Sequence, residues 1–244
     1  MVHFRDNFIF GSCNAENLHE QFINIDRYYG EMLFDSIKVL EQKRILKTRK
    51  NIFYNYLIIE ANGMFKLLKN IEEKQSATLD DLVFFKSIII YVGKGCRHRK
   101  TSHIFDSHKI LTGAMKEDKF SKKLEKIISI WKTGGGVIAL ELHSKSNNYI
   151  SMCRENAMIR SVGNNLTNLI NGSAYGAMKT TWTQKDAKLY GDMLIFFALE
   201  KCIKEKPISI LPSDMTLEVS TTHKNYSIKT NYELKGILEY FLEM

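Results

Sequence analysis

Apolar residues change their spacing along the chain, and each spacing predicts a different kind of element. From residue 18 to about residue 50 they recur every three or four positions, which is typical of an amphipathic helix. The positions on this face are Leu18, Phe22, Ile25, Tyr29, Leu33 and Ile37. The segment ends in a basic run over residues 43–50, which is typical of a solvated helix face, with a DNA contact as the alternative.

Three short segments rich in β-branched and aromatic residues predict strands. They cover residues 52–59, 87–92 and 137–142. Residues 60–63 and 93–95 follow the first two strands and contain glycine, which lets the backbone turn sharply, so both segments are predicted as turns. A run of three glycines over residues 134–136 separates the third strand from the helix before it.

Helical spacing returns between and after these strands. The predicted helices cover residues 97–111, 120–132 and 148–160, together with a short helix that begins near Thr78 and a long one that begins at Thr183. Either Asn147 or Asn148 is expected to cap the third of these helices. The pattern from residue 208 onward is mixed and predicts no element.

These elements predict an α+β fold in which helices flank a small three-stranded sheet, with added N- and C-terminal helices. We expect a helical N-terminal segment over residues 1–50, a core over 51–180, and a helical C-terminal extension over 181–244 that packs on the core. The apolar stretches are too short to span a bilayer, and the first residues lack the layout of a secretory signal. The sequence therefore predicts no membrane contact.

Charge narrows the class of partner. Lys and Arg number 35 against 27 Asp and Glu, which gives a formal charge of +8 and favours a polyanionic partner. Residues 94–126 alone carry ten basic and four acidic residues, a net charge of +6. The four cysteines are scattered and form no C-x-x-C pair, so we expect neither a zinc site nor a disulfide framework, and an intracellular location is the default.

Common catalytic motifs are absent from the sequence: it contains no G-x-S-x-G elbow, no G-x-x-x-x-G-K-[ST] phosphate loop and no H-E-x-x-H. His98, His103 and His108 are five residues apart, so one helix face does not gather them as a zinc trio. A different, ordered set of residues stands out. Its members are Tyr56, the run Tyr91-Val92-Gly93-Lys94-Gly95, Arg97, Arg99, His103, Glu155 and Asn168.

This ordered set resembles the motifs of the GIY-YIG nuclease superfamily, and in particular those of the animal ankyrin-repeat and LEM-domain endonucleases. The resemblance runs from about residue 52 to about residue 171. It implies an antiparallel sheet and the hydrolysis of phosphodiester bonds. The first motif reads Tyr54-Asn55-Tyr56 and lacks the usual glycine and isoleucine of the family, so Tyr54 competes with Tyr56 for the role of first tyrosine.

The resemblance also implies roles for the residues. One divalent metal ion, Mg²⁺ or Mn²⁺, would be held by Glu155, because a hard cation can take one carboxylate, several waters and a phosphate oxygen. Tyr56 would activate a water molecule with Tyr91 orienting it, and Lys94, an arginine and the metal would lower the tyrosine pKa. His103 would bind phosphate or relay a proton.

The remaining residues are expected to hold the substrate or the site. Either Arg97 or Arg99 would clamp the scissile phosphate, and the sequence leaves this choice open. Asn168 would hold the site together through its amide. Substrate contacts are expected from Gly93, Lys94, Gly95 and Lys100.

The sequence therefore predicts a metal-dependent DNA endonuclease, with branched or distorted DNA among its substrates and a nuclear or otherwise intracellular location. One alternative is a catalytically inactive nucleic-acid-binding module that keeps the fold. Another is a nuclease of a mobile element or of a restriction system.

Overall fold

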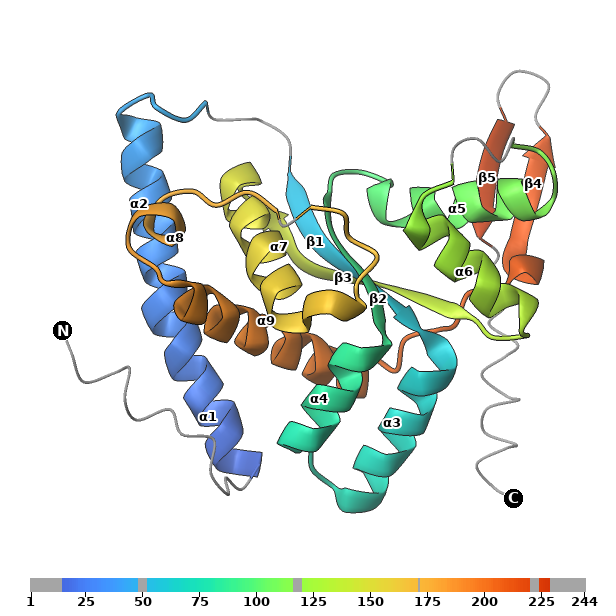
Figure 1. Cartoon of the computed structure of the whole chain (residues 1–244), viewed down its shortest axis with the longest axis horizontal. Coiled ribbons are helices and arrows are strands. Elements are labelled where there is room, and N and C mark those ends of the chain that lie inside the picture. Colours follow the sequence, from blue (N-terminus) through green and yellow to red (C-terminus); the bar gives the residue numbers. More distant parts are fainter. Residues whose placement is uncertain (1–14, 48–51, 116–119, 171, 220–223, 229–244) are drawn as a thin grey trace.

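A three-stranded antiparallel sheet lies at the centre of the protein (Figure 1). The computed structural model describes residues 15–47, 52–115, 120–170, 172–219 and 224–228. The strands β1 (Phe53–Glu60), β2 (Ile89–Gly95) and β3 (Val137–Ser146) are ordered β2-β1-β3, and β1 pairs antiparallel with both neighbours. The predicted sheet and its three strands are confirmed, and β2 and β3 are its edges.

The two faces of the sheet bury different cores because side chains alternate along β1. Tyr54, Tyr56 and Ile58 point into one hydrophobic cluster. Leu57 and Ile59 point into the other, larger cluster. The central strand is therefore buried on both sides, which explains its nearly continuous run of apolar and aromatic residues.

Each face is covered by its own pair of helices. Helices α5 (Arg99–Leu111) and α6 (Lys122–Lys132) pack on each other and supply Ile104, Ile127 and Ile130 to the cluster around Tyr56. Helix α7 (Asn148–Val162) covers the opposite face and packs along α9 (Gln184–Glu205). In Figure 1 the two pairs lie on either side of the strands. Asn147 caps α7 through its side chain, which accepts a hydrogen bond from the Tyr149 amide at 2.8 Å.

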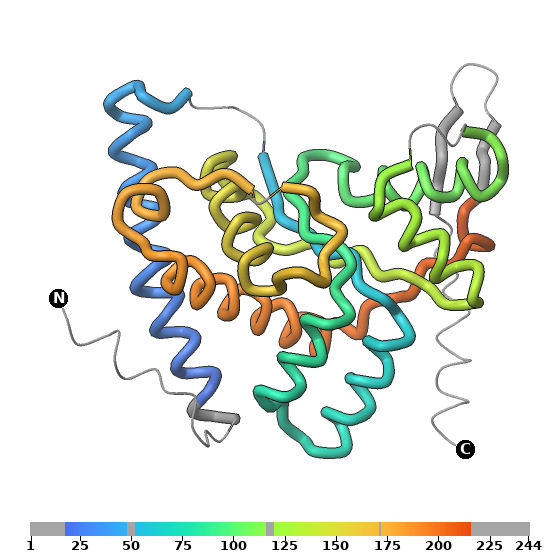
Figure 2. The backbone as a smooth tube through the Cα atoms, in the orientation of Figure 1, coloured from blue at the N-terminus to red at the C-terminus, as the bar shows by residue number. Residues whose placement is uncertain are grey.

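The N-terminal helical segment is divided by a π-helical turn. Helix α1 (Ala15–Ile25), the turn η1 (Asp26–Gly30) and helix α2 (Glu31–Gln42) follow one another along the edge of the molecule, where α1 packs on α9 (Figure 2). The helix was expected to continue to about residue 50 but ends at Gln42, and the chain then turns with Arg44 in the left-handed region at φ 56°. Part of the basic run, residues 48–50, lies outside the described residues.

The turn predicted at residues 60–63 is wrong, because α3 (Ala61–Lys74) begins directly after β1. Gly63 is a packing residue there: a Cβ atom at this position would lie 2.6 Å from Cγ2 of Ile88. The glycine lets α3 approach α4 (Leu79–Ile88) closely. The predicted helix start at Thr78 is confirmed by a capping box with Asp81.

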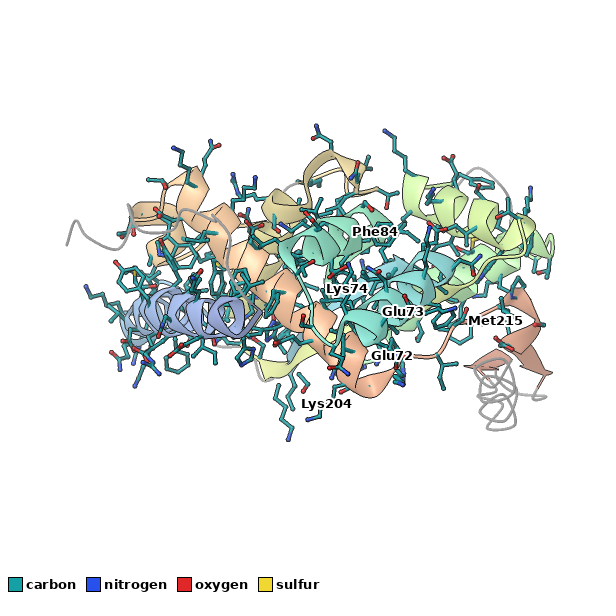
Figure 3. All side chains as sticks on the ribbon, turned by 90° about the horizontal axis from the view of Figure 1, so that it is seen from below. Glu72, Glu73, Lys74, Phe84, Lys204 and Met215 are labelled. Carbon is teal, nitrogen blue, oxygen red and sulfur yellow. The ribbon has the colours of Figure 1, made fainter. Side chains whose placement is uncertain are left out.

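The far end of α3 meets the far end of α9. Lys206, just after α9, bonds to Glu72 through atoms Nζ and Oε1 at 2.7 Å. Figure 3 views the molecule from below and labels Glu72 of α3 and Lys204 of α9.

The second strand lies later in the sequence than predicted. Ser87 and Ile88 close α4, and β2 begins at Ile89 and continues through Gly95. The glycines at 93 and 95 are therefore strand residues, and the turn follows them. Its unusual backbone conformation is at Arg97, with φ 53°.

After α7 the chain passes through η3 (Gly163–Asn165) and α8 (Ala177–Thr180) before α9. The predicted start of α9 at Thr183 is confirmed by a capping box with Asp186. The C-terminal extension was predicted as helical, but after α9 the chain forms η4 (Pro212–Asp214) and the hairpin β4 (Met215–Val219) and β5 (Lys224–Ile228). Across the described ranges, no helix combines the length and apolar character needed to cross a bilayer.

Candidate active site

Two tyrosines and a histidine meet on the face of the sheet that α5 and α6 cover. Tyr56 lies in the middle of β1, Tyr91 lies on β2, and their ring centroids are 5.9 Å apart. His103 comes from the first turns of α5, and its Nε2 atom lies 2.8 Å from the hydroxyl oxygen of Tyr56. Its ring also meets that of Tyr91 edge-on at 5.4 Å. The structure thus brings together three of the predicted site residues.

Gly93 makes room for the ring of Tyr56. These two residues are directly opposite each other across β1 and β2. A Cβ atom at position 93 would lie only 2.6 Å from the Tyr56 hydroxyl oxygen. Any larger residue at position 93 would therefore displace the Tyr56 ring. The role of this glycine is to leave space for that ring.

Lys123 is a site residue that the sequence analysis missed. The Nζ atom of this lysine on α6 lies 3.3 Å from Nε2 of His103 and 4.5 Å above the ring of Tyr91. Positions 123, 127 and 130 share one face of α6, and Ile127 and Ile130 belong to the cluster around Tyr56. The signal was present in the sequence, since Lys123 extends this apolar stripe by one turn.

Glu155 and Asn168 line the open edge of β2. Oε1 of Glu155 accepts a hydrogen bond from the Lys94 backbone amide at 2.9 Å. Asn168 bonds to both the N–H and the C=O of Val92, at 3.1 and 2.8 Å. These side chains satisfy backbone groups that an edge strand otherwise leaves unpaired.

The structure distinguishes the two candidate arginines. The charge of Arg99 acts on the pKa values of five site groups, which are Tyr56, Tyr91, His103, Lys123 and Glu155. Arg97 is not among the charges that shift these pKa values, and its backbone carbonyl accepts a hydrogen bond from the Tyr54 hydroxyl at 2.7 Å. Of the two arginines, Arg99 is therefore the one whose charge acts on the site groups.

The two predicted substrate lysines have partners within the protein. The ammonium group of Lys94 bonds to Oδ1 of Asn148 at 2.6 Å and lies 4.5 Å above the ring of Phe53. The ammonium group of Lys100 bonds to Oε2 of Glu141 on β3 at 2.6 Å.

Gly95 and Tyr54 shape the backbone that leads from β2 into α5. Gly95 accommodates Arg99, because a Cβ at position 95 would lie 2.6 Å from that of the arginine. Tyr54 holds the start of α5, with its hydroxyl accepting a hydrogen bond from the Lys100 amide at 3.1 Å.

A family model describes this region of the chain. The LEM-3-like GIY-YIG domain matches residues 53–217, from the start of β1 into β4, which is more than half of the chain. The chain belongs to this family. Its sequence is similar to Ankyrin repeat and LEM domain-containing protein 1 of Mus musculus, with 27% identity over 165 residues. It is also similar to the Caenorhabditis elegans homolog of that protein, with 28% identity over 131 residues.

The matched regions are parts of both relatives. They cover 66% of this chain and 30% of the mouse protein, and 53% of this chain and 18% of the nematode protein. The chain therefore spans less than a third of the length of these relatives. No solved structure matches the chain.

In this GIY-YIG domain the pKa values of Tyr56 and Tyr91 are both raised. Burial is the largest cause for Tyr56, and the charges of Tyr91 and Glu155 add to it against the opposing charge of Arg99. For Tyr91 the causes are burial and then the charge of Glu155. As expected, the charge of Arg99 acts to lower the pKa of both tyrosines, but it does not outweigh burial. The ammonium group of Lys94 bonds to Asn148 instead.

The histidine of the GIY-YIG domain is neutral at physiological pH. Burial lowers the pKa of His103 from 6.5 to about 3, and the positive charges of Lys123 and Arg99 act in the same direction. An ammonium group donates hydrogen bonds and accepts none, so the Nε2 atom that Lys123 approaches is the accepting nitrogen of the ring. The Tyr56 hydroxyl therefore donates to His103.

Glu155 is the carboxylate that the family resemblance assigns to a divalent cation, and one of its two oxygens is already bound by the protein. Its Oε1 atom is bound by the Lys94 amide, whereas Oε2 faces Gly172, where a Cβ would lie 3.3 Å away. Within the described ranges no three His, Cys, Asp or Glu side chains gather, so the ligand set of structural zinc is not found there. Burial raises the pKa of Glu155, and the Lys94 amide opposes this shift.

Proposed function

We propose that this chain is a metal-dependent DNA endonuclease, with branched or distorted DNA among its substrates. The observation that carries the proposal is the hydrogen bond between Tyr56 and the neutral His103. The charges of Arg99 and Glu155 both act on the pKa of this tyrosine. Phosphodiester hydrolysis needs a deprotonated water, compensation of the phosphoryl charge and help for the leaving oxygen. Family membership supports the nuclease class, and the names of the two relatives mention no substrate.

Tyr56 and His103 would activate water as a pair. The hydroxyl oxygen of Tyr56 takes a proton from water while its own proton passes to Nε2 of His103, so the tyrosine never carries a full negative charge. Burial is the main cause of the low His103 pKa, and the charges of Lys123 and Arg99 lower it further. A bound phosphate would neutralise these two cations and so make His103 a better acceptor. Tyr91 would orient the water or the phosphate.

Arg99 would hold the scissile phosphate, because a guanidinium group offers two parallel donors to phosphate oxygens. Glu155 would hold one Mg²⁺ or Mn²⁺ ion through Oε2. When bound, such an ion polarises the phosphoryl oxygen and stabilises the leaving alkoxide. Asn168 would keep the edge of β2 in place beneath this group.

Cleavage of labelled DNA tests the proposal. The substrates are linear duplex, single-stranded, flapped and four-way-junction DNA, each with Mg²⁺ or with a chelator. We expect cutting only with Mg²⁺, and we expect Glu155→Gln to abolish it while binding remains. Glu73→Gln, an exposed carboxylate on α3, is the matched control and should cut normally.

A second candidate function follows from the role of Glu155 at the strand edge. Its bond to the Lys94 amide stabilises β2 without any chemistry, and an inactive nucleic-acid-binding module would keep it. Binding of all four DNA substrates without cutting by the wild type, in Mg²⁺ or Mn²⁺, would favour this candidate.

A further inference from the structure

A cavity of about 500 Å³ lies beside Asn168, on the side of the molecule formed by the end of α7 and the start of α9. Its basic lining residues are Arg160, Lys185 and Lys188, and amides of Asn164 and Gln184 add polar donors. None of the lining residues, all within the described ranges, is acidic. The cavity is therefore lined by three cations, and none of the roles described above accounts for them.

Neighbouring acidic groups are turned away from this cavity into other contacts. Asp186 caps α9 through the Thr183 amide at 2.7 Å and accepts a hydrogen bond from Tyr29 at 2.8 Å. Asp192 bonds to Lys86 at 2.6 Å. The cation of Arg160 is held toward Asn156, whose Oδ1 accepts its Nε–H at 2.8 Å. The positive charge of the cavity is thus compensated by no carboxylate in its lining.

The loop that borders the cavity carries an exposed apolar tip. Leu169 and Ile170 have exposed fractions of 76% and 79%, the highest among the large apolar residues whose exposure is described. The tip is fixed on both sides. Asn168 bonds to Val92, and the carbonyl of Gly172 accepts a hydrogen bond from Asn156 at 2.5 Å. Single exposed apolar residues are common, whereas two neighbours on an anchored tip beside cations indicate a binding surface.

We propose that this surface binds a second segment of the DNA substrate, with backbone phosphates in the cavity and bases against Leu169 and Ile170. The proposal rests on the proposed function and extends it. Asn168 connects the two regions, because it lines the cavity and also bonds to β2 beside the candidate active site. Lysine and arginine contacts to phosphate are independent of sequence, and leucine and isoleucine side chains can insert between base steps where DNA is bent or unstacked.

Binding measurements on a cleavage-blocked background test the cavity. In Glu155→Gln protein, the double variant Lys185→Ala/Lys188→Ala is compared with Lys66→Ala/Lys69→Ala, two exposed lysines on α3. The probes are a fluorescent flapped duplex and a linear duplex, titrated between about 50 and 200 mM salt. We expect about tenfold or greater loss of affinity for the flapped duplex in the cavity variant, little loss for the linear duplex, and no loss in the control.

The salt dependence provides a second readout. Each phosphate contact that is lost should reduce the slope of log affinity against log salt by about 0.9, so the slope for the flapped duplex should fall by about 2. An unchanged slope, or a loss of affinity equal to that of the α3 control, would overturn the assignment of the cavity.

A second pair of variants tests the tip. Leu169→Ser/Ile170→Ser removes apolar area that is already exposed, so the fold should be unaffected. We expect several-fold weaker binding of the flapped duplex with an unchanged salt slope, because apolar contacts with bases release no counterions. Val83→Ser, at an exposed apolar position on α4, is the control. Equal affinity of tip variant and control would exclude a role of the tip in DNA binding.

Failure of this inference is distinguishable from failure of the proposed function. If the wild type cuts DNA and the cavity variants behave as their controls, only the second DNA surface is excluded. If the wild type binds no DNA at low salt, the nuclease proposal fails and this inference fails with it.

Discussion

The hydroxyl group of Tyr56 is buried, faces a neutral histidine and lies opposite a glycine that leaves space for its ring. Burial raises the pKa of Tyr56, so less of it is phenolate at neutral pH than of an exposed tyrosine. His103 offers its proton an accepting nitrogen at 2.8 Å. At the residue scale, the chemistry therefore depends on this pair more than on either side chain alone.

Removing the hydroxyl of Tyr56 tests this dependence. Tyr56→Phe should reduce the single-turnover rate of cleavage by about 10² to 10⁴, the usual range for loss of a general base, with DNA affinity nearly unchanged. Tyr54→Phe is the matched control, because its hydroxyl bonds only to the backbone at the start of α5. It should cost about 1 kcal/mol of stability and little rate. If Tyr54→Phe instead cut DNA much more slowly than Tyr56→Phe, Tyr54 would be the catalytic tyrosine.

The two arginines of the β2–α5 turn should behave differently. Arg99→Ala should lower the cleavage rate by about 10² or more, since it removes the donor that faces the tyrosines, the histidine and Glu155. Arg97 has φ 53°, a conformation that glycine adopts without strain. Arg97→Gly should therefore keep the rate and raise the unfolding free energy by about 1 kcal/mol. Rates from single-turnover assays and midpoints from urea unfolding check both expectations. A large loss of rate in Arg97→Gly would contradict the assignment.

At the element scale, Asp186 joins the N-terminal helices to α9. Its carboxylate closes the capping box of α9 and accepts a hydrogen bond from Tyr29 in the π-helical turn. Tyr29 also packs against Trp182 with ring centroids 5.0 Å apart. One buried carboxylate therefore fixes the beginning of α9 and the position of η1 together.

Asp186→Ala should destabilise the protein by about 2–4 kcal/mol, because it removes the cap and the buried hydrogen bond that Tyr29 donates to this carboxylate. Thr183→Ala, which removes only the other half of the capping box, should cost about 1 kcal/mol. Urea unfolding followed by circular dichroism measures both values. Equal costs for the two variants would mean that the bond to Tyr29 contributes nothing.

Local signals in the sequence predicted the local elements well. Strand composition located the sheet, and the capping residues Thr78 and Thr183 located two helix starts, because these signals depend on neighbours in the sequence. The prediction failed at glycines that are needed for packing between distant parts of the chain. Gly63 and Gly93 permit close approach of Ile88 and Tyr56, which the sequence does not announce, and they were taken as turn residues.

The sequence predicted which residues lie close together at the candidate site, except Lys123, but not the directions of their side chains. Tyr56, Tyr91 and His103 meet, and Glu155 and Asn168 flank them along β2, as the ordered motif predicts. The direction of each long side chain depends on the packing of whole helices. For that reason Lys94 and Lys100 have internal partners, and Lys123 on a third helix reaches the histidine.

At the scale of the whole molecule, two buried histidines connect stability to pH. The pKa values of His103 and His143 are each lowered to about 3, mainly by burial. Below the ordinary value of 6.5 the unfolded chain binds protons that the folded chain does not, so folded stability is complete above pH 6.5 and falls as the pH decreases toward 3. At pH 5 this effect amounts to roughly 2 kcal/mol for each histidine.

Replacing one of these histidines should reduce the acid sensitivity. His143 has φ 50°, which asparagine tolerates, and its Nε2 atom is buried without a hydrogen-bond partner in the described structure. In His143→Asn the difference between the unfolding free energies at pH 7 and pH 5 should be about 2 kcal/mol smaller than in the wild type. Urea titrations at the two pH values measure it. An unchanged difference would show that His143 does not contribute to the acid sensitivity.

The whole account depends on hydrolysis at Glu155 beside the tyrosine–histidine pair. The most direct test is the single-turnover rate at which wild-type and Glu155→Gln proteins cut a four-way-junction DNA as the Mg²⁺ concentration is raised. We predict a wild-type rate that rises with Mg²⁺ and saturates, and a rate at least about 10³-fold lower in the variant at every concentration. Equal rates for the two proteins, or cutting by the wild type that persists in a chelator, would contradict the proposed mechanism.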